Sequence, residues 1–99
     1  MKLLWTHEAL ERIVEIEKYI AKDSPVRAKE FIIQLIKRAQ SIQNNPRRGR
    51  IVPEFSLVDL RELIYKNYRI VYRIRKDTIE ILTVFESHRI IRVKEIFKK

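Results

Sequence analysis

Arginines recur on one strand-like stretch of this chain. In YRIVYRIR, residues 68–75, Arg69, Arg73 and Arg75 all occupy odd positions, and His88 and Arg89 follow the next apolar run. A guanidinium is a planar fork that binds the two oxygens of a phosphate or a carboxylate. A row of guanidiniums on one side of a strand therefore indicates an anionic partner, unless acidic neighbours neutralise the row.

The alternation of apolar and polar residues predicts a hairpin that presents this row on one face. With residues 76–77 as the turn, Arg73 lies opposite Glu80 and Arg69 lies opposite Val84. Because strand side chains alternate, one face is apolar and belongs to the core. That face collects Tyr68, Ile70, Tyr72, Ile74, Ile79, Ile81 and Phe85. The opposite face collects Arg69, Val71, Arg73, Arg75, Glu80, Leu82, Val84 and Glu86.

Two expectations follow for the second face. Arg69 has no acid opposite it, so Arg69→Ala is expected to leave the melting temperature within a few degrees and to remove a contact with a target. Val71, Leu82 and Val84 are expected to form an exposed apolar stripe. Either a bound partner or the C-terminal tail of the chain covers that stripe.

Length and composition indicate one domain, residues 1–99, with a hydrophobic content of 45% that supports a real core. No apolar run approaches the roughly 20 residues of a membrane span, so no membrane partner is expected. The chain has no Cys and only two His. We therefore expect no disulfide, no metal site and no other cofactor.

The formal net charge of +9 is unevenly distributed along the chain. Residues 46–99 hold 14 basic and 7 acidic residues, which leaves only a small excess for the first 45. A basic half indicates an anionic partner, either nucleic acid or an acidic protein segment. A solvated, soluble surface is the alternative interpretation.

Two helices are predicted in the first 45 residues. Thr6 caps a helix that reaches about Lys22, and Ser24 with Pro25 begins a second one. The second helix ends before the Asn-Asn-Pro sequence at 44–46, because proline disfavours helix in the residue before it. The short connection makes the two helices antiparallel neighbours.

Strand patterns occur at 2–5, 60–65, 68–74 and 78–86, whereas the connector from 46 to about 59 contains PRRGR and the only Gly. This order predicts an α+β fold, β–α–α–β–β–β, with the N-terminal α-hairpin packed on one face of an antiparallel sheet. A short C-terminal helix or tail completes it.

Taken in this order, the segments resemble the RelE/ParE superfamily of toxins from type II toxin–antitoxin systems. The resemblance covers nearly the whole chain. It rests most on RGRIVPE, on LRELIYKNYRIVYRI and on the V-x-x-x-H-R ending. It implies one of two activities on the same scaffold: RelE-like members cut mRNA in the ribosomal A site without a metal, and ParE-like members poison DNA gyrase.

The residues match the RelE catalytic pattern only in part. Arg69 matches the arginine of the Tyr-Arg motif, and Arg89 matches a second catalytic arginine. Leu60 and Glu62 stand where the RelE pattern has lysines, and no Tyr follows Tyr72. The acid–base set that metal-free RNA cleavage needs is therefore incomplete.

His88 could complete that set, because an imidazole has an unperturbed pKa of about 6.5. The other interpretation of His88 is a strand-end residue that bonds to the backbone. The Arg-Glu-Leu at 61–63 and the IVPE segment look more like ParE-type members, so a gyrase poison is favoured and a RelE-like nuclease is the alternative. A plain nucleic-acid-binding module is a third reading, although the chain shows no recognition helix, stacking platform or RNP motif.

The resemblance also implies partners and a location. A cytoplasmic toxin of this kind is neutralised by a cognate acidic antitoxin, whose tail would contact the Val71, Leu82 and Val84 stripe. The target is DNA gyrase, or the ribosome and its mRNA in the alternative. The arginines expected to contact the target are Arg47, Arg48, Arg50, Arg61, Arg69, Arg73, Arg75 and Arg89.

Overall fold

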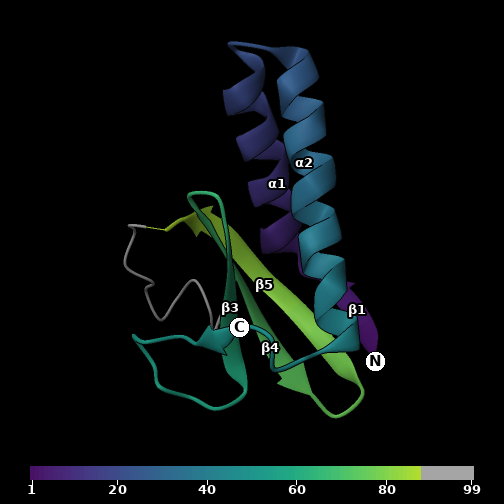
Figure 1. The fold of residues 1–99 in the computed structure, drawn as a ribbon, viewed down its shortest axis with the longest axis vertical. Coiled ribbons are helices and arrows are strands. Elements are labelled where there is room, and N and C mark those ends of the chain that lie inside the picture. The colour runs from purple at the N-terminus through teal and green to yellow at the C-terminus, as the bar shows by residue number, and fades with distance from the viewer. Residues whose placement is uncertain (88–99) are drawn as a thin grey trace.

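Two antiparallel helices pack against one face of a five-stranded sheet (Figure 1). The structure is a computed structural model that describes residues 1–87. Its elements are β1 (Lys2–Trp5), α1 (His7–Ala21), α2 (Pro25–Gln40), a short 3-10 helix η1 (Ser41–Asn44), β2 (Arg50–Ile51), β3 (Leu60–Tyr65), β4 (Tyr68–Arg75) and β5 (Thr78–Glu86). The predicted α+β class and its α-hairpin are confirmed. No helix in this part of the chain is long and apolar enough to cross a membrane.

Side-chain caps fix where both long helices begin. The Thr6 hydroxyl accepts a hydrogen bond from the backbone N–H of Ala9, and the Ser24 hydroxyl accepts one from the N–H of Arg27. Each cap satisfies one of the backbone donors left free at a helix start. Pro25 occupies the first turn of α2, where its missing N–H costs nothing. The predicted starts of both helices are therefore confirmed.

The sheet has the strand order β1-β5-β4-β3-β2. The sheet is mixed, because β1 runs parallel to β5 while the other neighbouring pairs are antiparallel. The strand β2 lies inside the predicted connector and is only two residues long. Two residues are too few to show an alternating pattern, which is why the sequence did not indicate this strand.

The β4–β5 hairpin contains a bulge that the sequence did not indicate. The pairing follows the predicted register as far as Tyr72, which lies opposite Ile81, but Val71 lies opposite Thr83. Leu82 is therefore the extra residue of β5. Beyond the bulge, every predicted pair is wrong by one residue.

The bulge exchanges the faces of two side chains. Val84 packs in the core beneath the helices, and Phe85 lies on the opposite face, where it is the pairing partner of Arg69. Val71 and Val84 have no exposed surface, and Leu82 is buried as well. The prediction that Val71, Leu82 and Val84 form an exposed stripe is therefore wrong.

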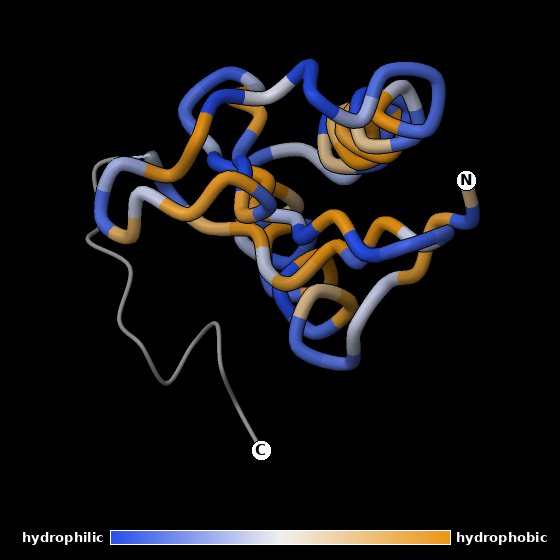
Figure 2. The backbone as a smooth tube through the Cα atoms, turned by 90° about the horizontal axis from the view of Figure 1, so that it is seen from below, coloured by the Kyte–Doolittle hydropathy of each residue, from blue (hydrophilic) through white to orange (hydrophobic). Residues whose placement is uncertain are grey.

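Each face of the sheet has its own apolar cluster. The larger one, called here the main core, joins the helices to the sheet. It consists of Ala9, Ile13, Ile16, Ile32, Leu35, Ala39, Ile42, Leu63, Tyr68, Ile70, Tyr72, Ile79, Ile81 and Val84. The smaller one, called here the second core, consists of Val52, Leu60, Val71, Leu82 and Phe85 with Phe55 packed against it. In Figure 2 the apolar stretches follow the helices and strands, whereas the turns are mostly hydrophilic.

The position of Val84 gives a direct test of the bulge. Val84→Thr is expected to destabilise the protein by about 1 to 3 kcal/mol, because it places a hydroxyl in the main core. Val58→Thr is the matched control, since Val58 is exposed. Urea unfolding of both variants measures the difference, and equal stabilities would contradict the bulge.

Candidate functional site

Arg69 lies at the centre of the sheet face opposite the helices and is 3% exposed. Its Nε donates a hydrogen bond of 2.6 Å to Glu62. Its Nη1 and Nη2 donate hydrogen bonds of 2.9 and 2.8 Å to the two carboxylate oxygens of Glu54. The guanidinium is therefore held by two carboxylates, one of them in the bidentate geometry that favours a strong pair.

Arg50 extends this network to the edge of the sheet. Its Nε donates to the second carboxylate oxygen of Glu62, whose side chain is fully buried. The Phe85 ring lies 5.3 Å from the Arg69 guanidinium and covers it from one side. We call Arg50, Glu54, Glu62 and Arg69 the ion cluster. Its two positive and two negative charges cancel.

The hydrogen bonds that Arg69 donates to Glu54 raise the pKa of the guanidinium above its ordinary value, and Glu62 raises it further, although burial opposes both. The guanidinium is therefore charged at every physiological pH. The prediction that Arg69 lacks an acidic partner is wrong. Its partners come from β3 and from the loop after β2, and not from the neighbouring strand β5.

One of the two missed acids had a signal in the sequence. In the β3–β4 hairpin, Ile64 lies opposite Arg69 and Glu62 lies opposite Val71. Glu62 and Arg69 are thus diagonal neighbours on one face, within reach of long side chains. Glu54 had no such signal, because it belongs to an irregular loop whose path follows no periodic pattern.

The other arginines predicted to contact the target lie at separate places in the structure. Arg47 and Arg48 are exposed on the turn that precedes β2, and Arg61 is half-buried on β3. Arg73 lies opposite Glu80, as predicted, and Arg75 makes a 3.2 Å ion pair with the same carboxylate. His88 and Arg89 lie outside the described residues. A role for any of these residues in target binding stays a prediction.

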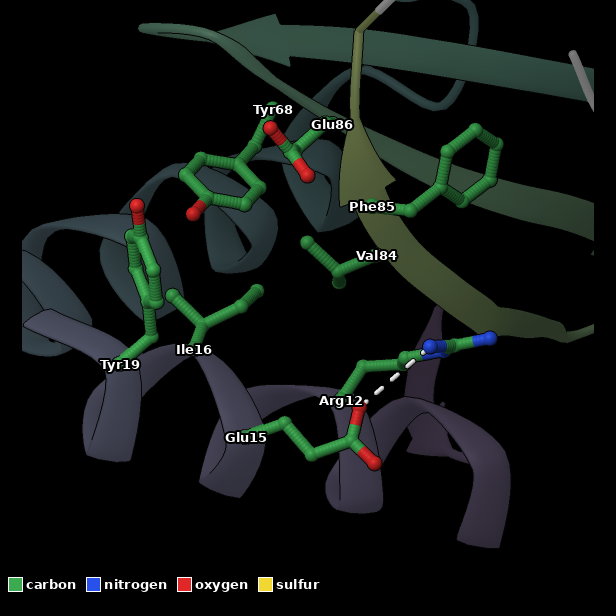
Figure 3. A pocket seen from close by; sticks show the side chains of 8 residues that line it. All are labelled: Arg12, Glu15, Ile16, Tyr19, Tyr68, Val84, Phe85 and Glu86. Carbon is green, nitrogen blue, oxygen red and sulfur yellow. Dashed lines mark hydrogen bonds and ion pairs between the residues drawn. The ribbon is translucent and has the colours of Figure 1, made fainter. Parts of the chain in front are cut away.

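A pocket of about 230 Å³ lies on the other side of the sheet, between α1 and the ends of β4 and β5 (Figure 3). Its lining consists of Arg12, Glu15, Ile16, Tyr19, Tyr68, Val84, Phe85 and Glu86. Burial raises the pKa of Tyr68, and Glu86 and Tyr19 raise it further. Arg12 is already engaged by Glu8 at 2.8 Å. With two carboxylates against one paired guanidinium, the pocket does not favour a phosphate.

Within residues 1–87, no three His, Asp or Glu side chains are grouped so that they could hold a metal ion.

This arrangement of two helices on a mixed five-stranded sheet is that of a RelE/ParE superfamily toxin. Residues 3–91 match the family described as the ParE toxin of the type II toxin–antitoxin system, parDE. The chain therefore belongs to the ParE toxin family, and its partner is an antitoxin.

Individual relatives agree with this assignment. A candidate toxin, Y4kP, of Sinorhizobium fredii is 35% identical over 88% of each chain. Toxin RelE2 of Caulobacter vibrioides is 29% identical, over 90% of this chain and 98% of that protein. A chain of the chromosomal ParDE toxin–antitoxin system from P. aeruginosa has a TM-score of 0.74 at 20% identity, over 87% of this chain and 95% of that one. The last similarity concerns the fold alone.

The ion cluster reverses the expected result of one substitution. Arg69→Ala is expected to cost about 3 to 5 kcal/mol, because it leaves two carboxylates without their shared cation. The melting temperature should fall by on the order of 15 °C. Arg75→Ala is the control on the same strand face; its exposed pair with Glu80 is worth under about 1 kcal/mol. Two similar melting curves would show that the cluster is not structural.

Proposed function

We propose that this toxin acts as a ParE-like poison of DNA gyrase and does not cleave RNA. The observation that carries the proposal is the engagement of Arg69 by Glu54 and Glu62. The location of the toxin on this proposal is the cytoplasm, where gyrase works on DNA.

A catalytic arginine must be free to bind the charge that develops on the phosphate. Arg69 is 3% exposed and already shares its donors between two carboxylates. Its release would leave the fully buried Glu62 without its inner cation, at a cost of about 3 to 5 kcal/mol. A substrate phosphate would have to supply that free energy before any catalysis.

The position of Glu62 adds a second argument. On the superfamily resemblance, this strand position carries a lysine in RelE-like nucleases, where a cation assists the reaction. A carboxylate at the same place repels phosphate and holds Arg69 inward. A glutamate in place of lysine at position 62 thus removes one cation of the RelE pattern and also binds Arg69.

The RelE-like alternative is favoured by one observation, the similarity to Toxin RelE2 of Caulobacter vibrioides. On that reading Arg69, His88 and Arg89 would be the catalytic residues, and the ribosome with its mRNA would be the target. Arg69 would first have to leave its two carboxylates.

The antitoxin of this chain is proposed to be acidic, because the toxin has a net charge of +9. Because Val71, Leu82 and Val84 are buried, the antitoxin tail is proposed to contact another surface of the toxin. We expect the product of an adjacent small gene to form a tight complex with the toxin. Co-expression that leaves growth inhibition unchanged would contradict this pairing.

One experiment separates the two activities. Purified toxin is expected to trap gyrase on cleaved plasmid DNA, and mRNA from induced cells is expected to stay intact in primer extension. His88→Ala should leave gyrase trapping unchanged, because no step of the proposed activity uses a general acid. Codon-phased mRNA cuts that disappear in His88→Ala, with no gyrase trapping, would establish the nuclease instead.

A further inference from the structure

The turn that precedes β2 is held by a buried hydroxyl. The Tyr72 hydroxyl donates a 2.7 Å hydrogen bond to the carbonyl oxygen of Pro46 and accepts a 2.9 Å bond from the N–H of Gly49. Tyr72 itself is fully buried in the main core. One side chain from the centre of the sheet therefore fixes both ends of the segment 46–49. We call residues 46–49 the basic turn.

Two further contacts make the basic turn rigid. Arg61 donates from Nη1 to the carbonyl oxygen of Gly49 at 3.0 Å. Gly49 lies so close to the sheet that a Cβ would be 2.5 Å from the Glu62 carbonyl oxygen and 2.7 Å from the Tyr72 hydroxyl. Only glycine fits there, although its φ is not in the left-handed region. In Figure 1 the segment crosses from the foot of α2 to the edge of β3.

The turn presents two arginines that the rest of the described structure does not use. Arg47 and Arg48 are both exposed, and neither side chain makes a hydrogen bond or an ion pair with residues 1–87. Residues 43–53 contain no acidic side chain. Arg12, Arg50, Arg69 and Arg75, in contrast, all have carboxylate partners.

A rigid turn lowers the entropy cost of binding, because its backbone is ordered before the ligand arrives. Arg47 and Arg48 each carry a guanidinium on a long side chain, so the turn can contact two separate anions. A DNA duplex supplies such anions as a regular row, about one charge per 1.7 Å of its axis. A carboxylate pair on a protein would need one particular spacing.

We propose that the basic turn binds the phosphodiester backbone of duplex DNA through Arg47 and Arg48. The inference rests on the proposed function in one respect: the DNA is the segment that gyrase holds when it is poisoned. The toxin would then contact both components of the cleaved complex. The contact carries no base specificity, because it is made to phosphates alone.

The test compares two variants that each remove two positive charges. The first is Arg47→Gln with Arg48→Gln, and the control is Arg27→Gln with Lys29→Gln, two exposed residues near the start of α2. Fluorescence anisotropy follows the binding of each protein to a labelled DNA duplex between about 50 and 200 mM salt. Loss of two phosphate contacts should reduce the slope of log K against log[salt] by about 2, and the control should keep the wild-type slope.

An equal loss of slope in both variants would show that the positive charge acts diffusely, and this would overturn the proposal. An unchanged slope in the Arg47/Arg48 variant would overturn it as well. Loss of antitoxin affinity without loss of DNA affinity would assign the basic turn to an acidic protein instead. The Arg47/Arg48 variant is also expected to need on the order of tenfold more protein to trap gyrase on DNA, with binding to gyrase alone unchanged. Trapping at the wild-type concentration would overturn the inference and leave the proposed function intact.

If wild-type protein traps no gyrase, the proposed function fails, and the duplex titration still decides whether the basic turn binds DNA. Tyr72→Phe supplies an independent readout, because it removes the hydroxyl that fixes the turn and keeps both arginines. Its DNA affinity should fall between those of wild type and the Arg47/Arg48 variant. An affinity equal to wild type in the folded variant would overturn the role assigned to rigidity.

Discussion

The second face of the sheet depends on the buried contact between Arg69 and two carboxylates. Glu54 belongs to the irregular loop between β2 and β3, and its bidentate pair ties that loop to the middle of the sheet. With the loop in place, Val52 and Phe55 can cover Val71 and the rest of the second core. Within residues 1–87 the helices cover one face of the sheet, and the loop between β2 and β3 covers part of the other.

The sequence was sufficient for the features that rest on local chemistry. Both helix starts could be predicted, because Thr6 and Ser24 cap them through side-chain bonds to nearby backbone. The bulge at Leu82 could not be predicted, since the segment ILTVF at 81–85 has apolar residues in both alternating frames. Glu62 could have been predicted as a partner of Arg69 from the β3–β4 register. Glu54 was not, because only the folded path of its loop brings it to Arg69.

The distribution of charge over the surface differs from what the composition suggests. Several arginines lie beside carboxylates that neutralise them, as in the ion cluster, so they add nothing to the net charge. The cations of the basic turn lie beside this neutral region and lack such compensation within the described chain. A net charge of +9 therefore says less about the proposed binding surface than the positions of Arg47 and Arg48 do.

The extra residue in β5 divides that strand into two segments with opposite side-chain phase. Before Leu82, odd-numbered residues such as Ile79 and Ile81 face the helices; after it, the even-numbered Val84 does. An alignment gap placed one residue too early or too late in this strand would assign core residues to the wrong face. Comparison of ParE-type sequences should therefore be anchored on the bulge itself, and natural length variation within this strand should occur in steps of two.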